Sequence, residues 1–360
     1  MEEAARGVRG RWPVGATLAL TGLLVGLLAL VAAARSTRST ETATATAVAD
    51  GQDLARFGPS ARRVQLTYAL RLRDLPPGAA RVEAWIPLPR EHAFQSLESY
   101  ALLEDYPAEE VEDEEFGNRF LRLGLTSAAR RAGGSPLPVT LEATVTRRVY
   151  SAWQRNGAPN RPPAGLARYL EPDRLVPTGG FIADEARRVV GESGEPLRKA
   201  RRLYDHVVRT LSYDKSGEGW GRGDAAHACD VRTGNCTDFH SLFIAEARSV
   251  GVPARFVIGV PLPADESEGT IGGYHCWSEF WLDDRGWVPV DASEAHKRPE
   301  LHELFFGGLD AHRVELTIGR DLDLPGAAVR ELNFVVYPHV EVDGALHEAV
   351  DTEFRFREPS

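Results

Sequence analysis

The stretch TGNCTDFHSLFIAEARSVGVPARF, residues 233–256, places a cysteine at the start of an apolar helical pattern. Apolar residues recur there at helical spacing: Phe239, Leu242, Phe243 and Val250. Gly251 then ends the predicted helix. Cys236 at the start of this helix has three possible roles, as a nucleophile, a metal ligand or a small buried apolar residue. The rest of the sequence has to separate them.

The sequence on either side of this stretch predicts an α+β fold. Residues 195–213, EPLRKARRLYDHVVRTLSY, have the apolar face of an amphipathic helix. Three strand-like runs follow the cysteine, ARFVIGV (254–260), GYHCWSEFWL (273–282) and GWVPVDAS (286–293). Helices followed by consecutive antiparallel strands are typical of an α+β domain, which we place at residues 165–310.

Residues 61–150 have a different pattern, in which apolar and polar residues alternate as in half-buried strands. We predict a β-sandwich-like domain there, followed by a Pro- and Gly-rich linker at 151–164. Its acidic run EEVEDEEF, 109–116, matches no calcium-binding loop and is expected to be a solvated loop. Residues 311–360 predict a C-terminal β extension. Whether its strands complete the catalytic sheet or return to the first domain stays open.

The N-terminus predicts a membrane anchor. Residues 14–34 contain no charged side chain and are long enough to approach the roughly 30 Å of a bilayer core. They follow a short Arg-containing tail, 1–13, and precede a Ser-, Thr- and Ala-rich flexible stalk, 35–60. We expect a single-pass protein of the cell membrane with its N-terminus inside and its body extracytoplasmic. A cleaved signal peptide is the alternative.

The overall charge excludes one class of partner. The chain of 360 residues has a formal net charge of −10, and its arginines and lysines are dispersed. Nucleic-acid-binding proteins carry a basic patch, which is missing from this sequence. We therefore predict no nucleic-acid partner.

Two residues of the strand-like runs complete a set that would activate Cys236. The free N–H groups of a helix N-terminus favour a thiolate, and a nucleophilic cysteine also needs a base and a group that orients this base. His275 and Asp291 lie on consecutive strands joined by LDDRG, 282–286. An odd number of loop residues, such as a three-residue loop ending in Gly286, places both side chains on one face of the hairpin. An even number places them on opposite faces unless a bulge intervenes, and the sequence leaves this register open.

The blocks GNCTDFHSLF, GYHCWSEF and GWVPVDAS resemble the three motif blocks of the transglutaminase-like superfamily, which has a papain-type fold. The resemblance covers about residues 165–310 and is closest to the bacterial, membrane-anchored branch. It implies that Cys236 is the nucleophile, His275 the general base and then acid, and Asp291 the group that orients His275. The backbone N–H of Cys236 is expected to bind the oxyanion, with Trp220 or Tyr274 as second donor. No calcium and no other cofactor is expected.

A zinc site is the main rival for the same thiol. The segment HACDVRTGNCTDFH holds four potential ligands, and their spacing differs from that of zinc fingers. These ligands are His227, Cys229, Cys236 and His240. The three cysteines also allow a Cys229–Cys276 bridge, a Cys229–Cys236 bridge, or three reduced thiols. Strand alternation directs Cys276 away from the face of His275.

A Cys-His-Asp triad would form a thioester on Cys236, which either water or an amine resolves. We expect a cysteine hydrolase, a peptidase or amidase, acting on a peptide or protein of the cell envelope. Transamidation to an amine and a catalytically silent binding module are the alternatives. The acidic, Gly-rich stretch PADESEGTIGGYH, 263–275, is expected to be a mobile rim of the cleft.

Overall fold

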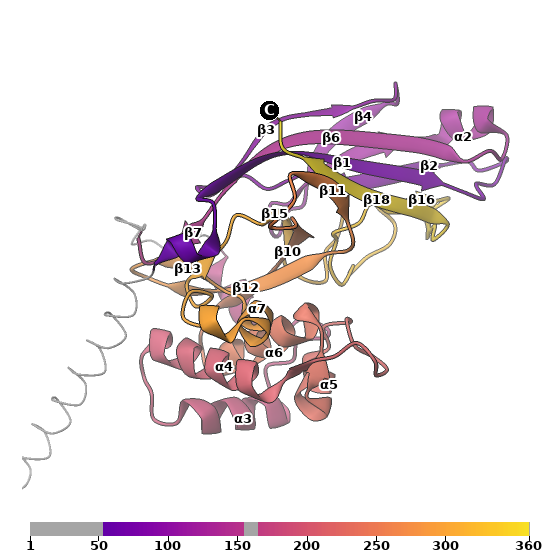
Figure 1. Cartoon of the computed structure of the whole chain (residues 1–360). Helices are drawn as coiled ribbons and strands as arrows, with labels where there is room; N and C mark the ends of the chain where they lie inside the picture. Colours follow the sequence, from indigo (N-terminus) through magenta and orange to yellow (C-terminus); the bar gives the residue numbers. More distant parts are fainter. Residues whose placement is uncertain (1–52, 155–164, 360) are drawn as a thin grey trace, which may run out of the picture. The chain divides into compact units, whose positions relative to one another are not determined.

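Helix α6 is the centre of a helical layer in the computed structural model, which describes residues 53–154 and 165–359 (Figure 1). Every residue of α6 from Cys236 to Arg248 is buried, as expected for a helix surrounded by other elements. It contacts the four other helices of this layer and strands next to them. The helices are α3 (Gly180–Val190), α4 (Pro196–Thr210), α5 (Ala225–Val231), α6 (Cys236–Ser249) and α7 (Ala292–Lys297).

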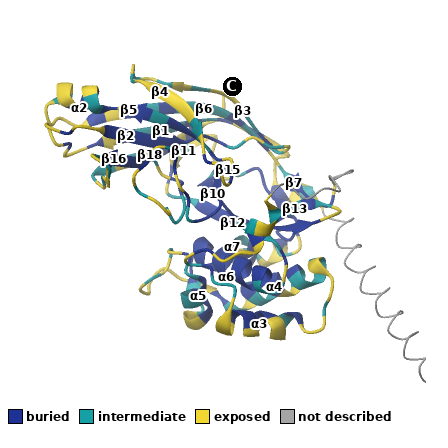
Figure 2. Cartoon of the chain, turned by 180° about the vertical axis from the view of Figure 1, so that it is seen from behind, coloured by how far each residue is buried: buried dark blue, intermediate teal, exposed yellow. Residues whose placement is uncertain are grey.

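The helical layer covers a four-stranded antiparallel sheet of order β13-β12-β10-β15. Its strands are β10 (Ala254–Pro261), β12 (His275–Leu282), β13 (Gly286–Val290) and β15 (Arg313–Ile318). Helix α6 packs on β12 and β10. All residues of β12 and β15 are buried, so both faces of this sheet are covered (Figure 2). The α+β fold predicted from the sequence is confirmed.

Two five-stranded antiparallel sheets hold most of the remaining strands, in the orders β11-β18-β1-β6-β3 and β17-β16-β2-β5-β4. The first contains β1 (Ala61–Leu72), β3 (Gln95–Leu102), β6 (Leu137–Arg148), β11 (Glu268–Ile271) and β18 (Val350–Arg357). The second contains β2 (Val82–Pro87), β4 (Ala108–Glu112), β5 (Arg119–Gly124), β16 (His339–Val342) and β17 (Ala345–Leu346). Alternate residues of β1 and β6 are buried, which agrees with the alternation in the sequence.

Short elements connect these layers. They are η1 (Leu54–Phe57), α2 (Thr126–Ala132), β7 (Tyr150–Ser151), η2 (Leu166–Leu170), β8 (Ser212–Tyr213), β9 (Thr233–Gly234), η3 (Pro299–Leu301) and β14 (Gly308–Leu309). Strand β7 pairs with β14, and β8 pairs with β9.

The strands after residue 310 have two destinations. Strand β15 completes the four-stranded sheet, whereas β16, β17 and β18 return to the two five-stranded sheets. The C-terminal segment therefore does both things that the sequence allowed. One of its strands completes the sheet next to the helices, and the others return to the sheets that contain β1 and β2. The boundaries of the predicted domains stay a prediction.

Two stretches expected as loops contain strands instead. Part of the acidic run 109–116 lies in the edge strand β4, where Glu109 and Glu110 pair with Arg122 and Arg119 of β5. In the stretch before His275, β11 pairs with β18. Cross-strand ion pairs and backbone pairing outweigh the polar, Gly-rich composition that suggested loops.

The predicted location in a cell membrane, with the body outside the cytoplasm, is contradicted. Within residues 53–154 and 165–359, no helix is long and apolar enough to cross a membrane. The longest helix described is α4, with 15 residues, and its length of about 22 Å falls short of a bilayer core of about 30 Å. The predicted anchor 14–34, the tail 1–13 and the stalk up to residue 52 lie outside the described residues, as do linker residues 155–164.

Candidate active site

Cys236 is the first residue of α6, and the turn before it is held by a capping box. Asn235 is the N-cap, and its side chain accepts a hydrogen bond from the N–H of Thr237 at 2.9 Å. The Asp238 carboxylate in return accepts from the N–H of Asn235 at 2.9 Å. A Cβ on Gly234 would collide with the Asp238 side chain, so this position needs glycine. The cap fixes the thiol at the positive end of the helix.

His275 and Asp291 come together across the β12–β13 hairpin. Leu282 pairs with Gly286, which leaves the three-residue loop 283–285. Because the number of loop residues is odd, His275 and Asp291 lie on one face of the hairpin. The loop ends at residue 285, one residue before the expected end at Gly286. His275 Nε2 is 2.7 Å from Asp291 Oδ2. The structure therefore brings these two predicted residues into direct contact.

Asp291 has a complete set of partners, although it is fully buried. One of its oxygens faces His275 and also accepts a hydrogen bond from Arg313 Nη1 at 2.8 Å. The other accepts from the N–H of Glu294 and from the Ser293 hydroxyl, because Asp291 is also the N-cap of α7. Burial would raise the pKa of Asp291, but the charges of His275 and Arg313 hold it well below its ordinary value.

The side chains of Cys276 and His275 act on the Cys236 thiol as hydrogen-bond partners that lower its pKa. Since Nε2 of His275 is bound to Asp291, the nitrogen that remains for the thiol is Nδ1. The bond from Cys276 contributes most to lowering the pKa of Cys236 well below its ordinary value. Burial opposes this effect, and the bond and charge of His275 add to it.

The pKa of His275 is shifted in the opposite direction. Burial would lower it, but the adjacent Asp291 carboxylate and the bond to Cys236 raise it to about 10. A lowered thiol pKa beside a raised imidazole pKa corresponds to a thiolate–imidazolium pair at neutral pH.

Cys276 and His240 extend this network in a way that the sequence did not predict. The N–H of Ala292 donates to His240 Nε2 at 3.1 Å, so the neutral ring carries its proton on Nδ1. His240 Nδ1 lies 3.6 Å from Cys276 Sγ. Burial lowers the pKa of His240 to about 4 and raises that of Cys276 well above its ordinary value. Both groups are therefore neutral, and the Cys276 S–H is available to donate to the Cys236 thiolate.

The four residues of the predicted zinc set do not converge. Cys229 donates to Glu185 at 3.2 Å, His240 is bound to the N–H of Ala292, and His227 contacts the Glu218 carbonyl oxygen at 3.1 Å. All three cysteines are free thiols, which corresponds to the third of the predicted redox arrangements.

The two predicted oxyanion donors differ in position. The Tyr274 hydroxyl accepts a hydrogen bond from Asn235 Nδ2 at 3.1 Å, beside the start of α6. Trp220 is 38% exposed, and its ring faces the ammonium group of Lys215. Tyr274 therefore lies at the thiol end of the helix, and so does the backbone next to Trp220, because the N–H of Gly221 donates to the Asp238 carboxylate at 2.7 Å.

His275 lines a cavity of about 410 Å³. Its other lining residues include Tyr213, Tyr274, Lys297, Asp310 and Arg313. Charges of both signs thus surround an opening that leads to the His275–Asp291 pair.

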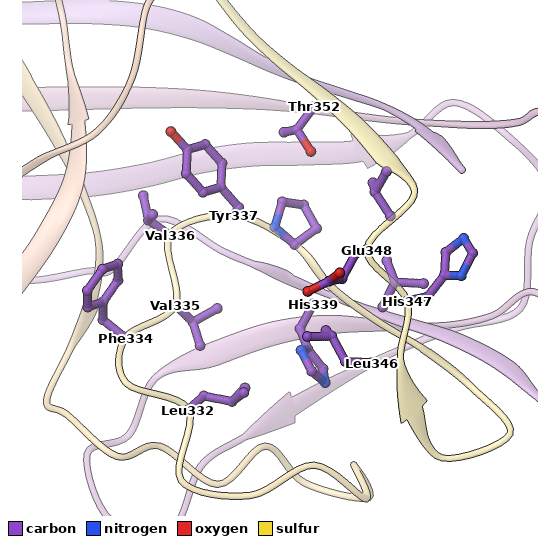
Figure 3. A pocket seen from close by; sticks show the side chains of 13 residues that line it. Leu332, Phe334, Val335, Val336, Tyr337, His339, Leu346, His347, Glu348 and Thr352 are labelled. Atoms are coloured by element: carbon purple, nitrogen blue, oxygen red, sulfur yellow. The ribbon is translucent and has the colours of Figure 1, made fainter. Parts of the chain in front are cut away.

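A larger cavity of about 580 Å³ lies among residues of the C-terminal segment (Figure 3). It is lined mainly by apolar side chains from Leu332 to Val340, with His339, His347 and Glu348 at its polar side. The Tyr274 ring contacts Phe334 and Tyr337 of its lining, with centroid distances of 5.8 and 6.3 Å. This apolar space is therefore next to the residue that precedes His275.

The comparison with protein families identifies the segment that contains these residues. Residues 183–292 match the family model described as the transglutaminase-like superfamily. This match spans Cys236, His275 and Asp291, and it confirms the resemblance inferred from the three motif blocks.

Individual proteins resemble a larger part of the chain. An uncharacterized protein of Haemophilus influenzae is 27% identical over 309 residues, covering 76% of this chain and 84% of that protein. An uncharacterized protein of Mycobacterium leprae is 27% identical over 162 residues, covering 42% and 53% respectively. A solved structure from Cytophaga hutchinsonii, named as a proposed cysteine protease, has a TM-score of 0.55 at 16% identity. It covers 84% of this chain and 93% of its own, and this similarity concerns the fold.

Proposed function

We propose that the chain is a cysteine hydrolase, a peptidase or amidase, in which Cys236, His275 and Asp291 form the catalytic triad. The observation that carries this proposal is the 2.7 Å contact between His275 and Asp291 beside the Cys236 thiol at the start of α6. The family match and the name of the Cytophaga hutchinsonii structure favour the same chemistry. The substrate class is a peptide or protein amide.

In the first half-reaction, the Cys236 thiolate attacks the amide carbonyl carbon and a C–S bond forms. The His275 imidazolium gives its proton to the leaving nitrogen, and the C–N bond breaks to release an amine. The negative oxygen of the intermediate is bound by the backbone N–H of Cys236 at the helix N-terminus. A thioester and a neutral His275 remain.

In the second half-reaction, His275 takes a proton from water and the hydroxide attacks the thioester. The C–S bond breaks, a carboxylic acid leaves, and the thiolate–imidazolium pair is restored. Asp291 stays ionised throughout and holds the ring through Nε2, with Arg313 fixing the carboxylate. An amine in place of water would give transamidation through the same thioester.

The domain organisation belongs to this proposal. Residues 165–310 would form the catalytic domain, and 61–150 a β-sandwich-like domain. The alternate burial along β1 and β6 supports the second assignment. Residues 311–360 would contribute strands to both.

The proposal is tested with a panel of peptide amides and with Cys236→Ala as the matched variant. The wild-type protein should release amine and form an acyl-enzyme at Cys236, whereas Cys236→Ala should reduce turnover by at least about a thousandfold. Iodoacetamide should modify Cys236 faster than the two other cysteines at neutral pH.

The same experiment separates the alternatives. If the thioester is resolved only when a primary amine is added, the activity is transamidation and not hydrolysis. Slow and equal alkylation of all three thiols, with no acyl-enzyme, would contradict the enzyme proposal and favour a binding module.

A further inference from the structure

A second polar cluster lies in the helical layer, on elements α3, α4 and α6 (Figure 1). Glu185, His206 and Glu246 each offer one potential ligand atom, and these atoms all lie within 4.8 Å of one another. His206 Nε2 is 2.9 Å from Glu185 Oε1 and 3.5 Å from Glu246 Oε1. Three separate helices thus deliver a nitrogen and two carboxylate oxygens to one place.

Glu246 is the unusual member of this cluster. Its side chain is fully buried, and neither carboxylate oxygen has a hydrogen-bond partner among residues 53–154 and 165–359. His206 Nε2 likewise lacks a hydrogen bond of acceptable geometry in this part of the chain. A buried carboxylate without a partner is costly, and buried charges in proteins are normally paired or bound to a metal ion.

The neighbouring groups satisfy Glu185 but not Glu246. Arg232 Nη2 lies 2.7 Å from both oxygens of Glu185, and the Cys229 thiol donates to the same carboxylate at 3.2 Å. The charge of Arg232 is therefore matched by Glu185. A further positive charge is needed if Glu246 is ionised.

We propose that Glu185, His206 and Glu246 form a binding site for a divalent cation of the zinc type. Imidazole and carboxylate ligands suit zinc, which binds them at about 2.0–2.2 Å in tetrahedral geometry. Ligand atoms on such a tetrahedron are about 3.4 Å apart. His206 Nε2 lies 3.5 Å from Glu246 and 2.9 Å from Glu185, so Glu185 would move outward slightly to bind the ion. Arg232 and Cys229 act on Glu185 from outside and hold it in position, as outer partners of metal ligands do.

This site is distinct from the candidate active site. Glu246 lies ten positions after Cys236 on α6, which corresponds to about 15 Å along the helix axis. The site ties α3 and α4 to the helix that carries Cys236. Its role is therefore structural support of α6, and it is independent of the proposed hydrolysis.

The test uses the full chain with Cys236→Ala as the background, because this removes zinc binding by the thiol of the active site. After dialysis against a chelator, Zn²⁺ alone is added and followed by calorimetry and by metal analysis. We expect one tightly bound ion per chain and a rise in melting temperature. Adding Glu246→Gln should weaken binding by about a hundredfold or more. Adding Glu192→Gln, an exposed position after α3, should leave it unchanged.

Two results would overturn the proposal. One is the absence of a tight site in the Cys236→Ala background, which would mean that Glu246 is protonated and neutral. The other is equal zinc affinity with and without Glu246→Gln, which would place the ion elsewhere. The melting temperature in chelator shows that each variant is folded, so neither result can arise from unfolding.

Discussion

The two ends of α6 differ in how their buried polar side chains are hydrogen-bonded. The first end is the N-terminal one, which carries Cys236, and the other end is the C-terminal one, which carries Glu246. At the first end, the side chains of Asn235, Asp238 and His240 all have hydrogen-bond partners on neighbouring segments. At the other end, Glu246 is equally buried, but both of its oxygens lack a hydrogen bond among the described residues. The same helix therefore contains one polar network that is complete and one that is not.

This difference separates two kinds of function. A complete network lets the protein hold charges of its own, such as the thiolate of Cys236 and the imidazolium of His275. An incomplete network holds a charge only when a ligand supplies the missing partner. Proton chemistry is thus expected at the first end of α6 and cation binding at the second.

Among variants that keep the thiol, the largest effect is expected for His275→Gln, which removes the proton donor and acceptor of the complete network. Amide hydrolysis should fall by about 10²–10⁴-fold. Alkylation of Cys236 at neutral pH should also slow, since the bond and charge of His275 lower the pKa of the thiol. Turnover and iodoacetamide labelling of the same samples measure the two effects.

The pH profile of the wild-type protein provides the control for this variant. The Cys236 thiolate is present above a lowered pKa, and the His275 imidazolium is present below a pKa of about 10. Hydrolysis should therefore fall as the pH rises through about 10, while alkylation persists because the thiolate remains. If hydrolysis and Cys236 alkylation were lost together at high pH, the thiolate–imidazolium pair of Cys236 and His275 would be contradicted.

Stability should respond with opposite signs at the two ends. Asp291→Ala leaves Arg313 and His275 without their shared carboxylate, and breaking a buried pair costs about 3–5 kcal/mol of unfolding free energy. Glu246→Leu, measured in chelator, should raise the unfolding free energy by about 1–2 kcal/mol, because an unpartnered carboxyl group is removed. Urea unfolding measures both, and destabilisation by Glu246→Leu in chelator would show that its carboxyl group is satisfied without an ion.

A smaller effect is expected for Cys276→Ala, which removes the partner that contributes most to lowering the pKa of Cys236. A bond to a charged group is worth about 1.5–3 kcal/mol, so the alkylation profile should move up by about 1–2 pH units. Cys276→Ser keeps a donor and should restore most of the wild-type profile. Identical pH profiles of Cys236 alkylation in the Cys276→Ala, Cys276→Ser and wild-type proteins would show that Cys276 does not influence the Cys236 thiol.

The smallest effect is expected for Trp220→Ala. The side chain is exposed and faces Lys215, so hydrolysis should stay within about twofold of wild type and stability within about 0.5 kcal/mol. A loss of 10²-fold or more in turnover would instead identify Trp220 as an oxyanion donor.

The sequence predicted the parts of the site that depend on local periodicity. The helical spacing after Cys236 predicted α6, and strand alternation predicted that His275 and Asp291 share a face if the loop between their strands has an odd number of residues. The structure agrees with both patterns. Each of these inferences needs only a few consecutive residues and a known period.

Long-range partners carried no comparable signal. Arg313, which fixes Asp291, comes from a strand that the sequence assigned to a C-terminal extension. Strand alternation predicted that Cys276 points away from the face of His275, yet both side chains interact with the Cys236 thiol in the structure. No local pattern marks Glu246 as buried, because nothing in the sequence near it shows that α6 is covered on every side.

Strand β11 has a consequence for how this protein can be divided. It pairs with β18, at the edge of the sheet built around β1, and only three residues separate its end at Ile271 from His275. A fragment limited to residues 165–310 would contain β11 without its partner strand. His275 would then be held only by the pairing of β12 with β10, where it lies opposite Gly259. Pairing of β11 with the sheet built around β1 therefore supports the alignment of the proposed triad from the other side of the loop 272–274.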